Sequence, residues 1–480
     1  MADFGIIRTM RYTKSGQTLN QVSAFGILSC SALCSALPTY AQPQISPYAI
    51  IQPTDAVEGN DFGLSPVVHD GKLYVGAGGV QNAGNAGTGG VYVFDVQTLA
   101  QEKYIHATTS PPNLPPERFG QSIAVQDGKL LVGSREDDPV STVKAGAAYL
   151  FEYPSGNQIA RYTQTNGGDN WPSPSFGEGV ALIGDVAVVS DPNGAWTPTG
   201  GGNKGTVNFY DISSGQQVES LNARYAPSGH FSFGEVLAVW NNQLIVAYDT
   251  GNSIHFYDPE THELLYEIAQ PGYPVPSHLV FFGTDLAVFG DTLVVSEAAY
   301  FYEEYFPSAV HIFDLNTREL IRTITITPDR GDRAFGRRIA ANDKYLITKL
   351  YKPGFSGGAM ALVYDTATGE QLGELLPLTD DLHNGFVYDG IAIDGDTAFI
   401  GNSAIAELPN PGGAILVYDL SQLGATCIAD TNGDGVLSPA DFSAWVAAFN
   451  AMAPECDQNG DGACSPADFS AWVANFNAGC

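Results

Sequence analysis

One repeating unit constrains this chain more than any other feature of its sequence. Each copy begins with Phe, usually as Phe-Gly, and continues with an alternating apolar run, an Asp-Gly-like turn, a second apolar run, a Gly-rich loop and a third run that ends in an aromatic residue and an acid. Several short strands at a period near 50 residues are typical of propeller blades. We therefore predict a mainly β fold with seven blades. The copies start at Phe62, Phe119, Phe176, Phe233, Phe282, Phe335 and Phe386.

The ends of the repeat region predict how the ring closes. A fourth apolar run lies between consecutive copies, for example at residues 264–270, so each blade has material for four strands. The seventh copy has no such run after Asp419, because the chain there continues into a cysteine-rich tail. We predict that segment 48–52, YAIIQ, supplies the missing strand, which removes sheet edges that favour aggregation. The predicted propeller covers residues 42–424.

The copies resemble the FG-GAP repeats of bacterial proteins, distant relatives of the propeller of integrin α subunits. The phrases FGQSIAVQDGKLLVGS and GAAYLFE of the second copy carry this resemblance, which extends over residues 48–420. A rigid ring that presents loops suits recognition of an extracellular ligand or partner. The repeated Phe would pack between blades, and the repeated Gly would allow a turn that side chains block. Many FG-GAP blades carry a DxDxDG calcium loop, and residues 48–420 contain none.

The first 41 residues have the pattern of an export signal. A positively charged start precedes an apolar run at residues 22–37, and small residues lead up to Ala41. The run is short for a membrane span and has no stop-transfer flank, so we predict a cleaved signal peptide over residues 1–41. The protein would then be secreted or on the cell surface, with no transmembrane segment left. A buried helix and lipid attachment at Cys30 are the alternatives.

The charge of the chain excludes several classes of partner. The formal net charge is −31, and removal of the predicted signal leaves 18 basic and 51 acidic residues, a net charge of −33. An excess of this size disfavours nucleic acid and anionic membranes as partners. It favours solubility and the binding of cations.

The tail contains the clearest chemical motif. Residues 430–441, DTNGDGVLSPAD, and residues 457–468, DQNGDGACSPAD, are 27 residues apart and match the twelve-residue D-x-N-x-D-G calcium loop. Calcium takes six to eight oxygen ligands, and each loop offers them at positions 1, 3, 5, 7, 9 and 12. We therefore predict two Ca²⁺ ions. The predicted ligands are Asp430, Asn432, Asp434, the Val436 carbonyl, Ser438 and Asp441, then Asp457, Asn459, Asp461, the Ala463 carbonyl, Ser465 and Asp468.

A helix is predicted after each loop, at residues 442–449 and 469–476, because apolar side chains recur there at i, i+3, i+4 and i+7. One loop and helix is too small to form a core, whereas two copies with two ions and disulfides suffice. We predict such a domain over residues 425–480. An even number of cysteines in an exported tail indicates disulfides. These cysteines are Cys427, Cys456, Cys464 and Cys480.

The pair of loops and helices resembles a dockerin, and the terminal Gly479-Cys480 resembles the GC-terminated variety. The resemblance covers residues 427–480 and implies docking to an extracellular protein. Cellulosomal dockerins recognise cohesins through Ser/Thr-type residues at loop positions 10 and 11, where this chain has Pro-Ala in both copies. A partner other than an ordinary cohesin therefore remains open. The resemblance also implies a Cys427–Cys480 clasp, with Cys456–Cys464 in the second loop.

Aromatic residues in two loop regions are candidates for a ligand surface. Exposed aromatic side chains often mark binding sites, including sites where sugars stack. Packing over a neighbouring blade is the alternative. The candidates are Tyr300, Tyr302 and Tyr305 of the fifth blade and Trp171 and Trp196 near the third.

Three functions fit these patterns. The first is a non-catalytic binding or display protein, with a possible glycan ligand, that docks through its tail. The second is a polysaccharide-active enzyme of an extracellular complex. The third is a purely structural surface protein. The eight histidines are scattered singly, and no catalytic constellation is recognisable, so we expect no enzymatic activity and assign no catalytic residue.

Overall fold

The structure is a computed structural model of the whole chain, and its description covers most of the ring and tail. None of the helices in these residues is long and apolar enough to cross a membrane. The residues described are 43–54, 61–79, 89–107, 118–135, 146–163, 175–194, 205–222, 232–248, 252–272, 280–299, 308–325, 335–351, 359–378, 389–403, 412–423, 429–432, 437–459 and 462–478.

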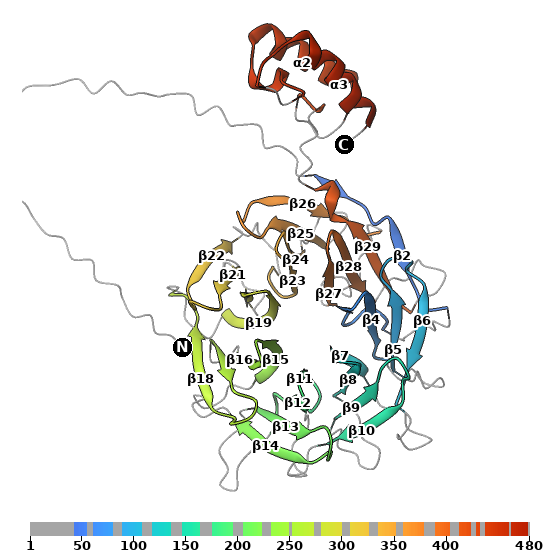
Figure 1. Cartoon of the computed structure of the whole chain (residues 1–480), viewed down its shortest axis with the longest axis vertical. Helices are drawn as coiled ribbons and strands as arrows, with labels where there is room; N and C mark the ends of the chain where they lie inside the picture. Colours follow the sequence, from blue (N-terminus) through green and yellow to red (C-terminus); the bar gives the residue numbers. More distant parts are fainter. Residues whose placement is uncertain are drawn as a thin grey trace, which may run out of the picture. The chain divides into compact units, whose positions relative to one another are not determined.

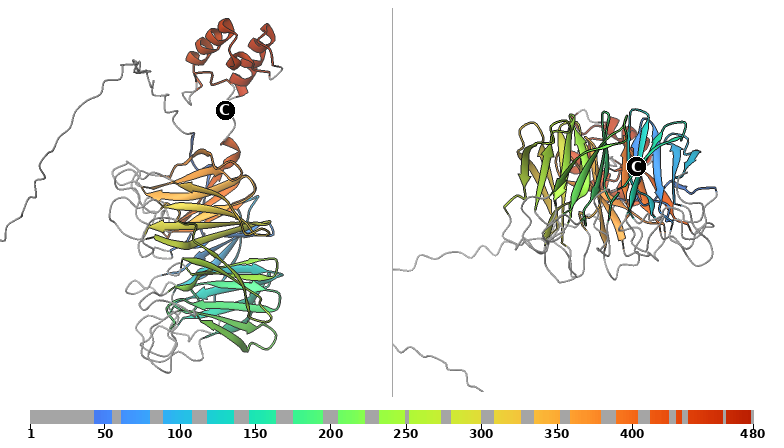
Figure 2. Two further views of the ribbon diagram at one scale, coloured as in Figure 1. Left: turned by 90° about the vertical axis from the view of Figure 1, so that its left-hand side faces the viewer. Right: turned by 90° about the horizontal axis from the view of Figure 1, so that it is seen from below.

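Seven antiparallel-rich sheets stand around a common axis, which confirms the predicted seven-bladed propeller (Figure 1). Blades one to four follow the chain in order, and Figure 2 shows their strands edge-on. Blade one consists of β3 (Val67–His69), β4 (Lys72–Ala77), β5 (Gly90–Asp95) and β6 (Gln101–Ile105), and blade two of β7 (Phe119–Gln126), β8 (Lys129–Ser134), β9 (Ala147–Glu152) and β10 (Gln158–Tyr162). Blade three consists of β11 (Val180–Ile183), β12 (Val186–Asp191), β13 (Thr206–Asp211) and β14 (Gln217–Asn222), and blade four of β15 (Phe233–Trp240), β16 (Gln243–Tyr248), β17 (Ser253–Tyr257) and β18 (Leu264–Ala269).

Blades five to seven continue the same order around the ring (Figure 1). In every blade the first of the four repeat strands lies innermost, next to the axis. Blade five consists of β19 (Val280–Phe289), β20 (Thr292–Ala299), β21 (Ala309–Asp314) and β22 (Leu320–Thr325). Blade six contains β23 (Ile339–Ala341), β24 (Tyr345–Tyr351), β25 (Ala359–Asp365) and β26 (Gln371–Leu375), and blade seven contains β27 (Ile391–Asp394), β28 (Thr397–Asn402) and β29 (Ala414–Asp419).

The N-terminal segment completes two blades. Strand β2 (Ala49–Ile51) pairs antiparallel with β29, so it supplies the outermost strand of blade seven. Strand β1 (Gln44–Ile45) pairs parallel with β26 and adds a fifth strand to blade six, which the sequence pattern did not predict. Its pairing depends on main-chain bonds, such as Glu374 N–H to the Pro43 carbonyl at 2.8 Å. A two-residue strand has no periodicity to reveal it.

The Phe-Gly starts have the structural role expected of them. Six of the seven phenylalanines are at most 1% exposed and pack in the cores between blades, and Phe386 lies outside the described residues. The glycine that follows each of these six has a φ between +76° and +113°. At Gly120 an added Cβ would also lie 2.7 Å from the carbonyl oxygen of Gly90. Backbone conformation and close packing therefore both require glycine there.

The acid that ends the third strand of most blades forms the next turn. Asp95 accepts a hydrogen bond from the Thr98 N–H at 2.9 Å, and Asp211, Asp258, Asp314 and Asp365 make equivalent bonds. Bonds from the Ser214 hydroxyl, the Ser213 hydroxyl and the Ser214 N–H lower the pKa of Asp211 to about 2. In these five copies the aromatic-acid ending is thus a side-chain-capped hairpin turn.

Candidate calcium loops of the C-terminal helical pair

The helices of the tail begin inside the predicted calcium loops. Helix α2 (Pro439–Ala451) and helix α3 (Pro466–Ala478) each start three residues before the predicted position. Ser438 is the N-cap of α2: its side chain accepts a bond from the Ala440 N–H, and the Asp441 carboxylate accepts one from the Ser438 N–H. This reciprocal pair is a capping box, and proline at the first helical position favours the same start.

The carboxylates at loop position 12 close both loops from inside. Asp441 and Asp468 are fully buried. Asp441 accepts bonds from the main-chain N–H groups of Asn432 and Ser438, at 3.2 and 2.8 Å. Asp468 repeats the pattern with Asn459 and Ser465, at 3.2 and 2.7 Å. Each carboxylate therefore ties the start of its loop to the N-terminus of its helix.

Hydrogen bonding keeps these two carboxyls ionised. Burial raises the pKa of Asp441, but N–H bonds from Ser438 and Asn432 outweigh it and the net pKa is lowered. The Ser465 N–H bond is the largest cause of the lowered pKa of Asp468. A buried carboxylate is stable only when it is paired or bound to a cation. The main-chain N–H groups stabilise the two carboxylates in part, but they do not neutralise the negative charge.

The first residue of each loop points to the same requirement. A side-chain hydrogen bond that involves Asp430 is among the causes that lower the pKa of Asp441, so the acids at positions 1 and 12 of the first loop lie close together. Carboxylate oxygens gathered in this way are the ligands that a hard cation prefers. In the second loop Asp457 accepts a bond from the Gly462 N–H at 2.8 Å, and Gly462 has a φ of +83°. This glycine makes the sharp turn predicted at position 6.

The predicted ligands are only partly within the described residues. Asp430, Asn432, Ser438 and Asp441 of the first loop and Asp457, Asn459, Ala463, Ser465 and Asp468 of the second are described, whereas Asp434, Val436 and Asp461 lie outside. In the described part, no three acidic, histidine or cysteine side chains are gathered as a ready metal cluster. The donors present are carboxylate, amide, hydroxyl and carbonyl oxygens, which fit a hard cation such as Ca²⁺.

The two copies complete each other's core. The Trp445 indole N–H donates to the Cys456 carbonyl at 3.2 Å, and the Trp472 N–H donates to the Ala429 carbonyl at 3.1 Å. These pairs are related by the 27-residue repeat, and each bond runs from the helix of one copy to the segment that precedes the loop of the other. Both tryptophans are core residues, at 5% and 6% exposed. Each copy therefore depends on the other to bury its tryptophan.

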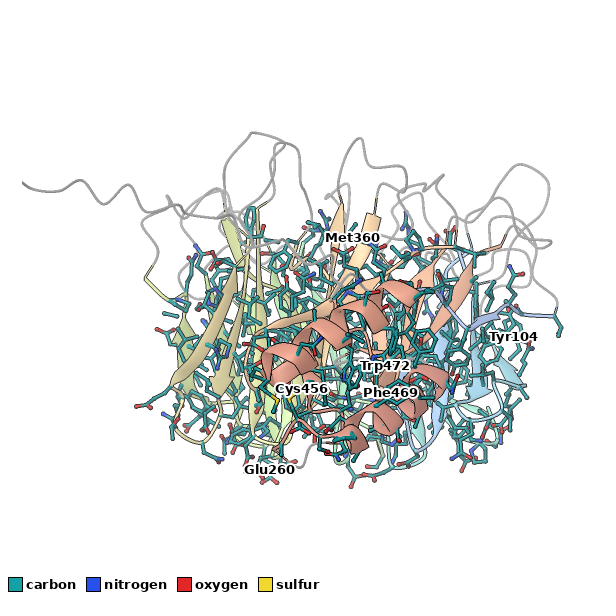
Figure 3. All side chains as sticks on the ribbon, turned by 90° about the horizontal axis from the view of Figure 1, so that it is seen from above. Tyr104, Glu260, Met360, Cys456, Phe469 and Trp472 are labelled. Atoms are coloured by element: carbon teal, nitrogen blue, oxygen red, sulfur yellow. A yellow bond between two sulfur atoms is a disulfide. The ribbon has the colours of Figure 1, made fainter. Side chains whose placement is uncertain are left out.

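The apolar face predicted for each helix divides into a buried and an exposed half. Trp445 and Trp472 face inward with the partly buried Phe449 and Phe476. The other half remains on the surface at 37–44% exposed, and we call it the tail face (Phe442, Val446, Phe469 and Val473). Across it, Phe442 contacts Trp472 and Phe469 contacts Trp445, with ring centroids 5.1 and 5.6 Å apart. Figure 3 labels Phe469 and Trp472 on the helical pair.

The tail contains one disulfide within the described residues. Cys456 and Cys464 are joined, with Cα atoms 5.6 Å apart, as the dockerin resemblance implies. The bond connects the short helix η3 (Pro454–Cys456) to the second loop. Cys427 and Cys480 lie outside the described residues, as do all five aromatic ligand candidates, Tyr300, Tyr302, Tyr305, Trp171 and Trp196.

Buried charges inside the ring escaped the sequence analysis. Lys349 of β24 is fully buried and donates to the carbonyls of Asp389 and Gly401 in the next blade, at 2.7 and 3.2 Å. Burial lowers the pKa of Lys349 to about 7 and raises that of Asp389 to about 6. The signal was present in the repeat, because YLITK stands where other copies have KLYVG and KLLVG.

A second buried polar pair occupies blade five. The His311 ring contacts the Glu297 carboxylate at 2.9 Å, and its other nitrogen contacts the Thr323 hydroxyl at 2.9 Å. Glu297 and His311 are at most 1% exposed, and they come from the neighbouring strands β20 and β21. Each of these three polar side chains has a hydrogen-bond partner, so the set serves the packing of the blade. Sequence spacing does not reveal it, because cross-strand neighbours are far apart in the chain.

The fold defines the class of protein: a seven-bladed β-propeller, joined to a small helical pair. The family model described as the FG-GAP repeat matches residues 115–151, which contain most of blade two. No curated protein matches the sequence.

Solved structures show likeness in fold. The WD40 repeats of RRP9 align with a TM-score of 0.50 and 11% identity, covering 78% of this chain and 99% of that one. The β-propeller domain of Cps50 (Swd1) from Myceliophteria thermophila aligns with a TM-score of 0.48 and 11% identity, covering 76% and 99%. At these identities the likeness concerns the propeller fold alone.

Proposed function

We propose that this chain is a secreted, non-catalytic binding and display protein, whose ring presents a recognition surface and whose tail docks to an extracellular partner when Ca²⁺ is bound. The observation that carries the proposal is the reciprocal tail, in which each copy buries the tryptophan of the other beside a loop closed by an ionised carboxylate. A rigid ring that presents loops suits recognition.

Calcium supplies the positive charge that the two loops lack. In the first loop Asp430, Asn432, Ser438 and Asp441 would hold the ion with Asp434 and the Val436 carbonyl. In the second, Asp457, Asn459, Ser465 and Asp468 would do so with Asp461 and the Ala463 carbonyl. The ion would compensate the negative charge of the buried Asp441 carboxylate. Since the loops lead into both helices, we infer that binding orders the whole tail.

The tail face is the surface we assign to docking. It exposes four large apolar side chains on a chain whose net charge is −31. Clustered apolar side chains on a soluble domain mark interaction surfaces. The face belongs to helices that begin in the loops, so ordering of the loops by calcium would set its shape.

Export fits the same proposal. The predicted signal peptide would deliver the chain to an exterior where disulfides persist, and the Cys456–Cys464 bond suits that compartment. Extracellular calcium modules of this kind bind with Kd values of about 10⁻⁴–10⁻³ M. At such affinities the tail would be loaded outside the cell.

A retention experiment on the full mature chain tests the proposal. The immobilised chain is incubated with the native secreted fraction in calcium or in chelator, and retained proteins are identified. We expect a partner that is retained in calcium, released by chelator and lost from a Phe442→Ala/Phe469→Ala variant. A Leu264→Ala/Leu265→Ala variant, which removes exposed apolar side chains from the ring instead, is the matched control. Equal retention with chelator, or no heat on calorimetric titration with Ca²⁺, would refute the proposal.

A further inference from the structure

A cavity of about 380 Å³ lies along the inner strands of three consecutive blades. Its walls come from β7, β11 and β15, of blades two, three and four, and these strands lie next to the ring axis (Figure 1). Ligand pockets for small molecules have volumes of about 300–1,000 Å³. The cavity is therefore large enough for a compact organic molecule and too small for a folded segment.

The lining carries no charge. Its side chains are aliphatic apart from two carboxamides, Gln126 and Asn242, at the end near the hairpin turns. Ile123, Leu182 and Leu237 are among the apolar residues, and none of the described lining residues is ionisable. A charged ligand would find no charged partner among these side chains, so the lining favours a neutral ligand.

The walls also offer main-chain hydrogen bonds. Each of β7, β11 and β15 is the terminal strand of its sheet, so one edge has no partner strand. An edge strand presents a row of unpaired N–H and C=O groups. The cavity therefore combines hydrocarbon surface with donors and acceptors that belong to no side chain.

The rest of the inner ring has a different character. In blades five to seven, Asp285, Arg338, Lys349 and Asp389 influence one another's charge and lie on or beside the inner strands. None of these residues lines the cavity. The cavity lining is thus uncharged, whereas charged residues lie elsewhere on or beside the inner strands, including Glu178 and Glu235 of blades three and four.

We propose that the uncharged cavity binds a small neutral organic molecule, with a hydrocarbon body that lies against the aliphatic side chains and a hydroxyl or amide group that bonds to Gln126, Asn242 or the free strand edges. This assigns a ligand class to the ring. It is independent of calcium binding by the tail, because the residues involved all belong to blades two to four.

A charge series on the unaltered mature chain tests the ligand class. Benzyl alcohol, benzoate and benzylammonium share one ring and differ in charge, and ligand-observed NMR titration gives their affinities. We expect saturable binding of benzyl alcohol that is at least tenfold tighter than that of either ion, and unchanged by chelator. Equal binding of all three, or no saturable binding of the alcohol, would overturn the proposal.

A matched pair of variants tests the location. Ala124→Leu adds volume at the cavity wall, and Ala287→Leu makes the same change at the equivalent position of blade five, outside the cavity. We expect at least a tenfold loss of benzyl alcohol binding for Ala124→Leu and less than a twofold change for Ala287→Leu. Equal effects would place the ligand elsewhere. Should Ala124→Leu fail to fold, the charge series still decides the class of ligand.

Discussion

The contacts between neighbouring blades, which we call seams, are of two kinds. The seams after blades one and two differ from the seam after blade six. At the seams after blades one and two, Gly76 and Gly133 lie against the main chain of the next blade, where an added Cβ would overlap the carbonyl oxygens of Gly120 and Gly177. At the seam after blade six the same strand position holds Lys349, whose ammonium group bonds to the main chain of blade seven.

Serine hydroxyls reinforce the glycine seams. Ser65 donates to the Gln121 carbonyl and Ser122 donates to the Gly177 carbonyl at 2.8 Å, each across to the next blade. At the corresponding place in blade six stands Arg338, close enough to affect the pKa values of Lys349 and Asp389. One seam type depends on close main-chain packing and neutral hydrogen bonds, and the other depends on balanced buried charge. The two should therefore fail differently when they are altered.

The largest effect is expected from the lysine seam. Lys349→Met removes the cation and leaves the buried Asp389 carboxyl without it, which we expect to cost about 3–5 kcal/mol of the free energy of unfolding. Urea unfolding of the mature chain measures the change. The double variant Lys349→Met/Asp389→Asn should recover most of the loss, because no uncompensated charge remains. Equal loss in both variants would mean that the charges are not coupled.

The glycine seam should be the next most sensitive. Gly76→Ala places a methyl group against the Gly120 carbonyl, so the blades must move apart, at a cost of about 3 kcal/mol. Gly272→Ala is the control, because its Cβ would meet nothing within 4 Å. Thermal and urea unfolding should separate the two variants. A neutral Gly76→Ala would show that the seam has room to adjust.

The two seams should also respond differently to pH. Burial raises the pKa of Asp389 to about 6, so this group favours the folded state at low pH and its contribution falls as the pH rises through 6. Burial lowers the pKa of Lys349 to about 7, so its contribution is recovered as the pH rises above 7. Stability should thus have a dip of roughly 2 kcal/mol between pH 6 and 7, absent from Lys349→Met/Asp389→Asn. Unfolding midpoints of the unaltered chain and of this double variant at pH 5, 6.5 and 8.5 check this. The same pH dependence in both would contradict it.

The smallest effect is expected at the serine hydroxyls. Ser122→Ala removes one hydrogen bond between blades two and three and should cost about 1 kcal/mol. Ser213→Ala, in an exposed hairpin turn, serves as control and should change the unfolding midpoint less. A loss at Ser122 as large as that of Lys349→Met would remove the distinction between neutral and charged seams.

The sequence predicted best where local chemistry repeats. Within a few residues of each other, Phe begins a copy, Gly takes a positive φ and an acid forms the hairpin turn. Because this pattern recurs in the seven copies, it predicts seven similar blades. The calcium-loop motif likewise predicted the turn at Gly462, and the apolar periodicity after each loop predicted both helices. Their starts were placed too late, because Ser438 and Pro439 were assigned to the loop although they cap the helix.

Features that depend on distant partners were not predictable in the same way. Strand β1 owes its existence to blade six, more than 300 residues further along the chain. The exposure of Phe442 follows from how two helices cross, which a single helical periodicity does not specify. Lys349 was visible as an exception to its repeat, but its partners become evident only when blades six and seven lie side by side.

The double engagement of the N-terminal segment has a consequence for the order in which the protein matures. Strands β1 and β2 belong to the first residues made, and their partners β26 and β29 are among the last of the ring. Native closure must therefore wait until nearly the whole polypeptide is available, and pairing over such separations is slow. Any nascent or truncated chain that ends before Ala414 leaves the outer edge of the last blade unpaired, so closure of the ring itself reports that every blade has been made.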